Sequence, residues 1–264
     1  MPREEEGLAI TQYHADHTAV SKSMLTVFKH SRREYFERFV AKTKTDQRKT
    51  NEMALGTLAH VAILEPDRWA SEYVVAPAWT RGHKKLFEDY AVEVANTGKT
   101  VVAFDDHRAI ESMAESATRI AGNLLAMSGD VETPIRWLDD ETGLMLKALP
   151  DKWLAPVMLD LKTTHDPSGS QFWWTVKKFD YAMQDAHYSD GAKRVHGSDC
   201  SFHFIVVQNK KPFAAAMYML PEDVREDARR RRRKLLMDLA DCYVSGIWDD
   251  RGAPCAAQQE DAVW

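Results

Sequence analysis

Lys147-Ala-Leu-Pro-Asp151, followed after eight residues by Asp160-Leu-Lys162, is the most informative stretch of this chain. Side chains two apart on a strand point to the same face. Asp160 and Lys162 should therefore project together, while the leucines beside them face the other way. Asp151 ends the neighbouring strand, where a short connection can bring it beside Asp160. We expect two carboxylates and one lysine to converge on one point.

This grouping of charges suits metal-assisted hydrolysis. Mg²⁺ takes oxygen ligands and needs only a few carboxylates besides water and substrate phosphate. The ion activates water and neutralises phosphoryl charge, while a lysine can position that water or stabilise the charged transition state. The alternative interpretation is a surface salt bridge between Asp160 and Lys162. The Pro-Asp pair at strand–turn–strand spacing favours the hydrolytic site.

Strands surround this stretch on both sides. Residues 131–138, 144–149 and 157–163 are predicted to form an antiparallel meander of three strands, with a turn at 139–143. Two further strands are expected at 201–208 and 214–220.

Helical periodicity fills the rest of the chain. Helices are expected from Ser21 to about Phe39, as one helix or a pair, and at 51–64, 105–127, 170–178, 181–195 and 221–244, with a loop at 42–50. The order of elements predicts an α/β (α+β) fold with one central mixed sheet flanked by helices. We expect a single domain over residues 1–264, with a core at about 20–220, a C-terminal helix at 221–245 and a tail.

The composition is that of an ordinary globular protein. The 264 residues carry 35 basic and 40 acidic side chains, a net charge of −5. This balance counts against nonspecific coating of nucleic acid but not against a nuclease, whose metal site is itself acidic. No apolar run approaches the ~18 residues of a membrane span, and the acidic N-terminus does not resemble a secretory signal. Three scattered cysteines fit a reducing cytoplasm, and the lack of an apolar span fits no membrane association.

Several motifs together resemble a known superfamily. Pro150-Asp151 … Asp160-Leu-Lys162 resembles the PD-(D/E)XK nuclease signature, and Gly56-Thr-Leu-Ala-His60 … Leu64-Glu-Pro66 is similar to a segment of RecE-like exonucleases of the exonuclease VIII type. Further matches, in the family order, are Ser21-Lys-Ser-Met-Leu … Lys29-His-Ser31, Asp160-Leu-Lys-Thr-Thr164 and Tyr181-x-x-Gln184-x-x-x-Tyr188. The resemblance spans roughly residues 20–220 and implies a PD-(D/E)XK nuclease-like core.

The resemblance also implies site residues. It makes Asp151, Asp160, the Leu161 backbone carbonyl and His60 metal ligands, with Glu132 as a further candidate ligand. The alternative for His60 is a satisfied core histidine, although Gly56 one turn earlier would let this helix approach the sheet closely. The resemblance places a second set, Gln184 and Tyr188, at the catalytic centre with Lys162. These two lie at i and i+4 on one helix face, which could equally be ordinary packing.

The function implied is Mg²⁺-dependent exonucleolytic hydrolysis of double-stranded DNA, with Mn²⁺ as a possible substitute. By resemblance the direction is 5′→3′, and the single-stranded tail passes to a RecT-like annealing protein during recombination in a bacterial or phage-infected cell. Processive relatives close into rings, so a homo-oligomer, trimer or tetramer, is expected. The alternatives are a structure-specific or restriction-type endonuclease on the same fold, and a non-catalytic DNA-binding protein.

Three features remain open at this stage. Leu149 stands where the family often has an arginine, so another group must grip any phosphate held there. The basic run Arg229–Lys234 wraps the whole circumference of its helix, which favours a salt-bridged, solvated helix over a DNA contact or a subunit interface. Trp173 or Trp174 could stack on a base or wedge a duplex end, while core packing is expected for at least one of them.

Overall fold

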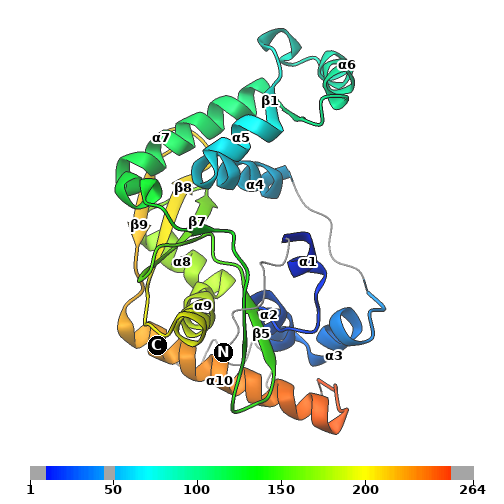
Figure 1. Ribbon diagram of the computed structural model, residues 1–264, viewed down its shortest axis with the longest axis vertical. Helices are drawn as coiled ribbons and strands as arrows, with labels where there is room; N and C mark the ends of the chain where they lie inside the picture. Colours follow the sequence, from blue (N-terminus) through cyan, green and yellow to red (C-terminus); the bar gives the residue numbers. More distant parts are fainter. Residues whose placement is uncertain (1–9, 45–50, 251–264) are drawn as a thin grey trace.

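The computed structural model describes residues 10–44 and 51–250 (Figure 1). Its centre is a five-stranded mixed sheet in the order β3-β6-β7-β8-β9. Only β7 and β8 are parallel; the other neighbours are antiparallel. The strands are β3 (Asp130–Val131), β6 (Lys152–Trp153), β7 (Val157–Thr164), β8 (Ser201–Gln208) and β9 (Ala215–Tyr218).

Helices cover both faces of this sheet. On one face, α4 (Asn51–Leu64) and α7 (Phe104–Ala126) pack on a core that includes Leu159, Leu161, Ile205 and Val207. On the other, α8 (Gly169–Phe179) and α9 (Tyr181–His196) pack on a core that includes Met158, Phe202, Phe204 and Val206. The alternation of these residues along β7 and β8 is the two-residue period of a strand. A central mixed sheet flanked by helices is the architecture expected from the sequence.

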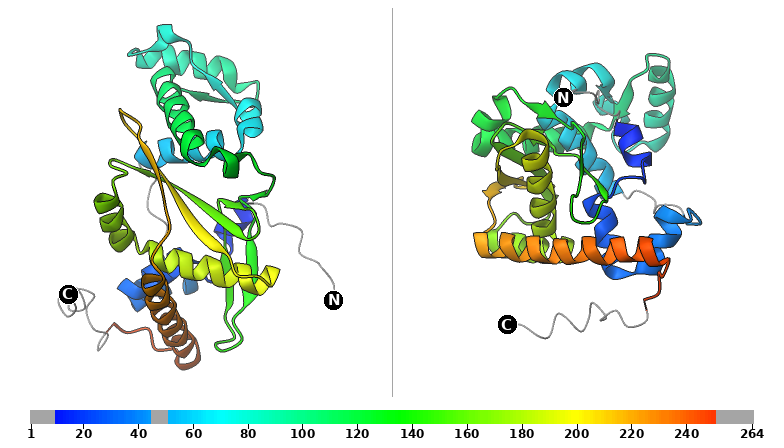
Figure 2. Two further views of the ribbon diagram at one scale, coloured as in Figure 1. Left: turned by 90° about the vertical axis from the view of Figure 1, so that its left-hand side faces the viewer. Right: turned by 60° about the horizontal axis from the view of Figure 1, so that its bottom comes forward.

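A third core lies on the far side of α9. It is built by α2 (Lys22–His30), α3 (Arg32–Tyr35), the π-helical η1 (Phe36–Val40), the hairpin of β4 (Ile135–Leu138) and β5 (Met145–Ala148), and α10 (Glu222–Ser245). Ser21 caps α2 by accepting from the Met24 N–H, and Ser31 caps α3 by accepting from the Glu34 N–H. A short helix that the sequence did not predict, α1 (Ile10–Ala15), precedes them. Figure 2 shows α9 and α10 stacked beneath the sheet.

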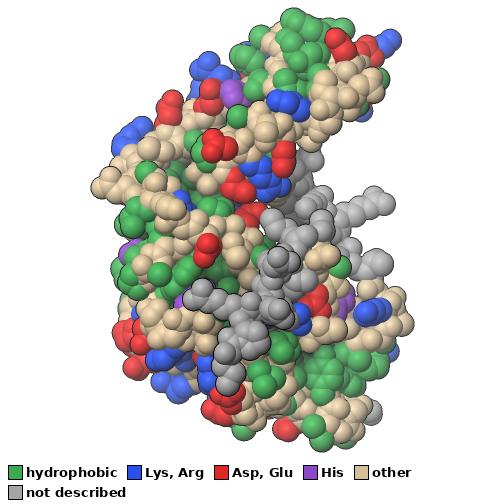
Figure 3. Space-filling view, in the orientation of Figure 1, with side chains coloured by type: hydrophobic (Ala, Val, Ile, Leu, Met, Phe, Trp, Pro, Cys, Tyr) green, Lys and Arg blue, Asp and Glu red, His purple; other side chains and the backbone are tan. Residues whose placement is uncertain are grey.

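Residues 66–102 form a small outlying unit. It contains α5 (Pro66–Glu72), β1 (Tyr73–Val75), the 3₁₀ turn η2 (Ala78–Thr80), α6 (Lys84–Ala95) and β2 (Thr100–Val102), with β1 and β2 paired in parallel. Hydrophobic side chains gather over this unit at the top of Figure 3, where Trp79, Leu86 and Val92 are exposed. None of the helices in the described ranges is both long and apolar enough to cross a membrane.

The predicted three-stranded meander is wrong. The first strand breaks into β3 and β4 because Glu132 takes a left-handed conformation with φ 43° and proline occupies position 134. β4 then pairs only with β5, while β7 pairs with the two-residue β6 and with β8. The predicted helices agree closely with α4, α7, α8, α9 and α10. Part of the predicted loop, 45–50, and the tail beyond 250 lie outside the described residues.

Candidate active site

The candidate site lies at an open edge of β7. Because β6 begins only at Lys152 and is two residues long, it pairs with β7 at Met158 and Leu159 but not beyond. The next N–H on that edge, of Leu161, has no strand partner and donates instead to Asp151 Oδ2 at 2.6 Å. The interrupted sheet therefore brings the Asp151 carboxylate to the edge of β7 near Asp160 and Lys162, although the strand pairing that the spacing suggested is not the one found.

Asp160 is engaged through both of its oxygens. Gln184 Nε2 on α9 donates to Oδ1 at 2.5 Å, and Lys162 Nζ lies 2.6 Å from Oδ2. The Asp160 carboxyl group is almost fully buried, so these two neighbours replace the water that an exposed carboxylate would have. The pair of Asp160 and Lys162 is therefore not a surface salt bridge.

Lys162 keeps its proton. Burial alone would lower the pKa of its ammonium, but Asp160, Asp151 and Tyr181 outweigh burial and raise it. The Nζ also lies over the Tyr181 ring, 4.9 Å from the centroid. A protonated lysine can donate hydrogen bonds and stabilise negative charge.

His60 approaches Asp151 from α4, which packs on the face of the sheet opposite to α9. Its Nδ1 lies 3.5 Å from Asp151 Oδ2. The helix that carries it comes close to the sheet, since a Cβ on Gly56 would stand 3.2 Å from Thr163 Oγ1 on β7. Burial raises the pKa of Asp151, and the charge of Asp160 raises it further against the effects of His60 and Lys162. Such a carboxylate is stabilised by any cation placed beside it.

Glu132 lies beside this group and is held by an arginine. Its N–H donates to the Asp151 carbonyl at 3.2 Å, and its Oε2 lies 3.7 Å from Arg68 Nη1. Arg68 also binds Glu65 at 2.8 Å, so one guanidinium bridges the two glutamates. Burial raises the pKa of Glu132, with Glu65 and Asp151 adding to that rise. Sequence reasoning missed Glu65 and Arg68, although Glu65 stood inside the Leu-Glu-Pro motif.

Tyr188 joins α9 to the strand that leads into Asp151. Its hydroxyl makes a backbone hydrogen bond with Leu149, and burial, the largest influence, keeps its pKa well above the ordinary value. Next to it, His187 Nε2 lies 3.0 Å from the Lys147 carbonyl. Gln184 and Tyr188 thus touch the site from one helix face, and Tyr188 also packs in the core beneath.

Lys22 is a site neighbour that the sequence did not single out. Its Nζ donates to the Phe179 carbonyl at 2.6 Å, which ties α2 to the end of α8. Burial lowers the pKa of Lys22 to about 8; Asp180 and Asp160 oppose this shift and Lys162 adds to it. A lysine in the first turn of an amphipathic helix has the pattern of a solvated residue, so only the packing of α2 reveals its position.

A divalent cation fits the chemistry of these donors. Among the residues that the structure describes, no three histidine, cysteine or carboxylate side chains form a group able to hold a metal ion as they stand. Asp160 Oδ2 is buried and has the Lys162 ammonium as its charged neighbour at 2.6 Å. With Asp151 and His60 it offers two carboxylates and one imidazole, ligands that Mg²⁺ or Mn²⁺ accepts.

The basic run on α10 lies away from this site and is largely ion-paired. Arg232 is buried and reaches Asp190 at 2.9 Å, while Arg233 binds Asp139 at 2.9 Å. The other pairs are Arg229 with Glu222, Arg230 with Asp227, and Arg231 with Asp180 and Asp227. The salt-bridged interpretation therefore describes most of the run, although Arg232 belongs to the core rather than to a solvated surface.

Comparisons with known proteins show the family and the fold of the chain. A family described as PDDEXK-like domain of unknown function, DUF3799, matches residues 21–261. The crystal structure of a "Putative exonuclease" from Eubacterium rectale has a TM-score of 0.65 at 12% identity, covering 98% of this chain and 95% of that one. A phage-related exonuclease from Haemophilus somnus 129PT gives a TM-score of 0.38 at 14% identity, covering 88% and 98%. No curated protein matches the chain significantly.

At 12% identity the first of these structures shows a shared fold and nothing finer. The family match covers most of the chain and includes His60, Pro150-Asp151 and Asp160-Leu-Lys162. The mixed sheet flanked by helices agrees with it. The chain therefore belongs to the PDDEXK-like family DUF3799 and has the nuclease-like fold of that superfamily.

Proposed function

We propose that this protein is a divalent-metal-dependent deoxyribonuclease of the RecE-like, exonuclease VIII type. It would degrade one strand of double-stranded DNA from an end, in the 5′→3′ direction. The observation that carries the proposal is the arrangement at the open edge of β7, where Asp151, Asp160 and the charged Lys162 lie together beside His60.

We assign each residue of this group a role. Asp151, Asp160 and His60 would hold Mg²⁺ or Mn²⁺, with Glu132 and the Leu161 carbonyl as further ligands on the same side. The ion would supply an activated water and neutralise charge on the phosphodiester. Lys162, which keeps its proton, would donate to the attacking water or to a phosphoryl oxygen. Gln184 would hold the Asp160 carboxylate in place, and Tyr188 would fix α9 against the strand that carries Asp151.

The proposal includes the biological partners. The single-stranded tail left by strand degradation is the substrate that a RecT-like annealing protein requires. A net charge of −5 gives the surface little general attraction for DNA. A homo-oligomeric ring would keep such an enzyme on its substrate during processive degradation.

The test compares linear duplex DNA, labelled separately at its 5′ and 3′ ends, with a covalently closed circle. Mg²⁺-dependent loss of the linear DNA alone, abolished in EDTA and in Lys162→Ala, supports the exonuclease, and early release of the 5′ label gives its direction. Cutting of the circle would show an endonuclease instead of an exonuclease. Binding without cleavage of either DNA, with Mg²⁺ or Mn²⁺, would leave a non-catalytic DNA-binding protein.

A further inference from the structure

Helix α8 exposes an unusual set of side chains. Its inner face is apolar, with Phe172 and Val176 buried against the sheet. Trp174 is 70% exposed and Trp173 37% exposed, so the expectation that one tryptophan packs in the core is wrong. Phe172 occupies that place because it shares the inner face with Val176, one turn later. In the left view of Figure 2, α8 lies at the edge of the molecule with one side free of other elements.

Two lysines share this outer face with the tryptophans. Lys177 follows Trp173 by one turn, and its Nζ lies 5.7 Å from a Trp173 ring centroid. Lys178 follows Trp174 in the same way, and its Nζ lies 5.3 Å from the Phe179 ring centroid. The sequence of α8 contains no acidic residue. The outer face therefore carries aromatic rings interleaved with positive charges.

The only acidic residue at the end of this helix is already neutralised. Asp180, its C-cap, is buried and binds Lys29 at 3.2 Å and Arg231 at 3.1 Å. These two cations lower its pKa against the effect of burial. The positive potential of the two exposed lysines is therefore not cancelled by the residue that follows the helix.

Ring contacts link the C-terminal end of α8 to the candidate active site. The Phe179 ring, itself half exposed, lies 5.9 Å from the Tyr181 ring and nearly parallel to it. Tyr181 in turn lies under the Lys162 ammonium at 4.9 Å. A row of contacts thus runs from Lys162 through Tyr181 and Phe179 to Lys178, and Trp174 lies one helical turn before Lys178.

We propose that the outer face of α8, formed by Trp173, Trp174, Lys177 and Lys178, binds unpaired DNA together with the half-exposed Phe179 at the end of the helix. The strand it holds is the one to be cut, because the row of contacts ends at Lys162. Bases would stack on the rings and phosphates would lie on the lysines. Stacking requires free base faces, which a single strand has and the interior of a duplex does not. This inference rests on the proposed nuclease function and deepens it, since it makes a separated strand the bound substrate.

The test measures binding of a fluorescently labelled oligothymidylate of about 20 nucleotides by anisotropy in EDTA, where no bond is cut. Trp174→Ala is expected to weaken binding about tenfold, the loss of one stacked base. Lys177→Ala/Lys178→Ala is expected to weaken it and to flatten its salt dependence. The matched controls are Trp79→Ala and Lys84→Ala/Lys85→Ala, also exposed but in the outlying unit, which should bind as the unchanged protein does.

Unchanged affinity in both α8 variants would overturn the proposal, as would no binding by the unchanged protein. A changed molar mass in light scattering, with unchanged affinity, would make α8 a protein interface instead. The two proposals fail separately. Cleavage by the unchanged protein with normal binding by the α8 variants removes only the α8 inference. Binding that depends on α8 without cleavage removes only the nuclease.

Discussion

Gln184 on α9 donates a 2.5 Å hydrogen bond to Asp160 on β7, and this bond fixes the carboxylate whose other oxygen faces Lys162. Without the amide, Asp160 Oδ1 would be buried and unpaired, and the carboxylate would turn. Gln184→Ala is therefore expected to lower kcat about 10- to 100-fold and to raise the Mg²⁺ concentration needed for half activity. A titration of nuclease rate against Mg²⁺ measures both effects.

The isosteric variant Gln184→Glu sharpens this prediction. It keeps the shape of the side chain but places a second carboxylate against Asp160, so the rate should fall at least as far as in Gln184→Ala. Unfolding midpoints identify any variant that has merely lost its fold. If both variants retain kcat and Mg²⁺ dependence, Gln184 is ordinary helix packing, the alternative that its i, i+4 spacing with Tyr188 left open.

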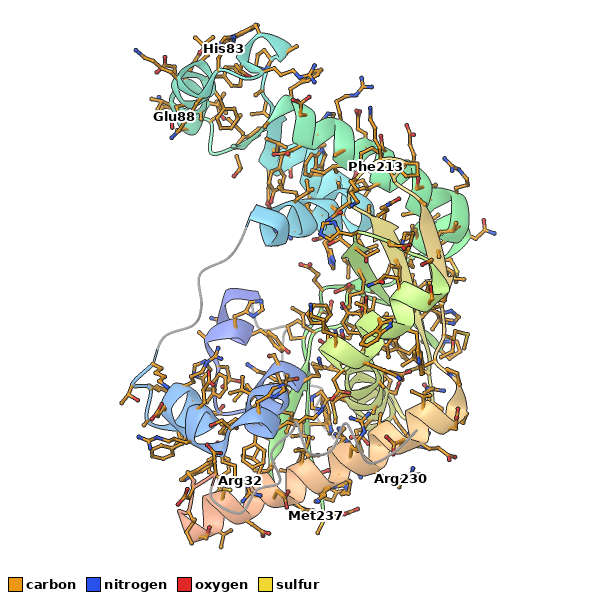
Figure 4. All side chains as sticks on the ribbon, turned by 180° about the vertical axis from the view of Figure 1, so that it is seen from behind. Arg32, His83, Glu88, Phe213, Arg230 and Met237 are labelled. Carbon is orange, nitrogen blue, oxygen red and sulfur yellow. The ribbon has the colours of Figure 1, made fainter. Side chains whose placement is uncertain are left out.

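Arg230 and Arg232 test the meaning of the basic run on α10. Arg232 is 4% exposed and binds Asp190, whereas Arg230 is 70% exposed and points outward (Figure 4). Removing one partner of a buried ion pair leaves a buried charge unpaired, so Arg232→Ala should cost roughly 3 kcal/mol of unfolding free energy. Arg230→Ala should cost less than about 0.5 kcal/mol. Urea denaturation measures both.

The exposed Arg230 also tests whether the basic run on α10 contacts DNA. Arg230→Ala should leave duplex affinity and its salt dependence unchanged, measured by anisotropy in EDTA. A fall in affinity with a flatter salt dependence would show that this exposed arginine touches phosphate. Lys84→Ala, an exposed cation in the outlying unit, is the control for a general change in charge.

The residues that the sequence placed correctly are those whose neighbours are local. Asp160 and Lys162 meet because they alternate on one strand, and Asp151 joins them through a short connection. His60 could be placed only through the resemblance, since it reaches Asp151 across about 90 residues. Lys22 and the Glu65–Arg68–Glu132 group escaped prediction because their contacts depend on how separate helices pack. The meander failed because nothing local showed that β7 would leave β5 for β6 and β8.

The two tryptophans of α8 illustrate a different limit. Phe172, Trp173 and Trp174 are consecutive and all apolar, so helical periodicity allows only part of the trio on the inner face. Which residue faces inward depends on the phase of the helix, and Val176 fixes it by pairing with Phe172. Hydrophobicity alone ranked the three residues equally.

Buried His187 predicts a loss of stability in mild acid. Arg232 Nε can only donate, so His187 Nδ1 accepts from it at 3.2 Å and Nε2 must donate to the Lys147 carbonyl. Burial, with Arg232 adding to it, lowers the pKa of His187 to about 3. Between pH 6.5 and 3 the unfolded chain therefore binds a proton that the folded chain does not. Stability falls as pH falls through this window, by about 3 kcal/mol from this group at pH 4.5.

His187→Gln isolates that contribution. A glutamine can donate to the Lys147 carbonyl and accept from Arg232, but it does not titrate. The variant should lose less unfolding free energy than the unchanged protein between pH 7 and pH 4.5, as measured by urea denaturation at each pH. Parallel losses in the two proteins would show that His187 does not govern the acid response.

Gly191 lets α9 pack closely against the β4–β5 hairpin. Adding one methyl group at this position tests how close that packing is. A Cβ at this position would stand 2.6 Å from the Trp137 ring and 2.9 Å from Ile135 Cδ1. The ring cannot easily move away, because its Nε1 donates to Asp190 at 3.1 Å. Overpacking of this kind costs about 1–3 kcal/mol. Alanine gains up to about 1 kcal/mol over glycine inside a helix, so the clash should prevail.

Gly191→Ala is therefore expected to lower the unfolding free energy by about 1–2 kcal/mol and to change the fluorescence of Trp137, which the clash displaces. Gly169→Ala is the matched control, since its Cβ would meet only Tyr218 atoms at an ordinary 3.9 Å. That variant should be neutral or slightly stabilising. Because α9 also carries Gln184, the same displacement should lower the nuclease rate in Gly191→Ala but not in Gly169→Ala. Equal stability of Gly191→Ala and the unchanged protein would mean that the hairpin can move to accept the methyl group at no cost. The contact at Gly191 would then not determine the position of α9.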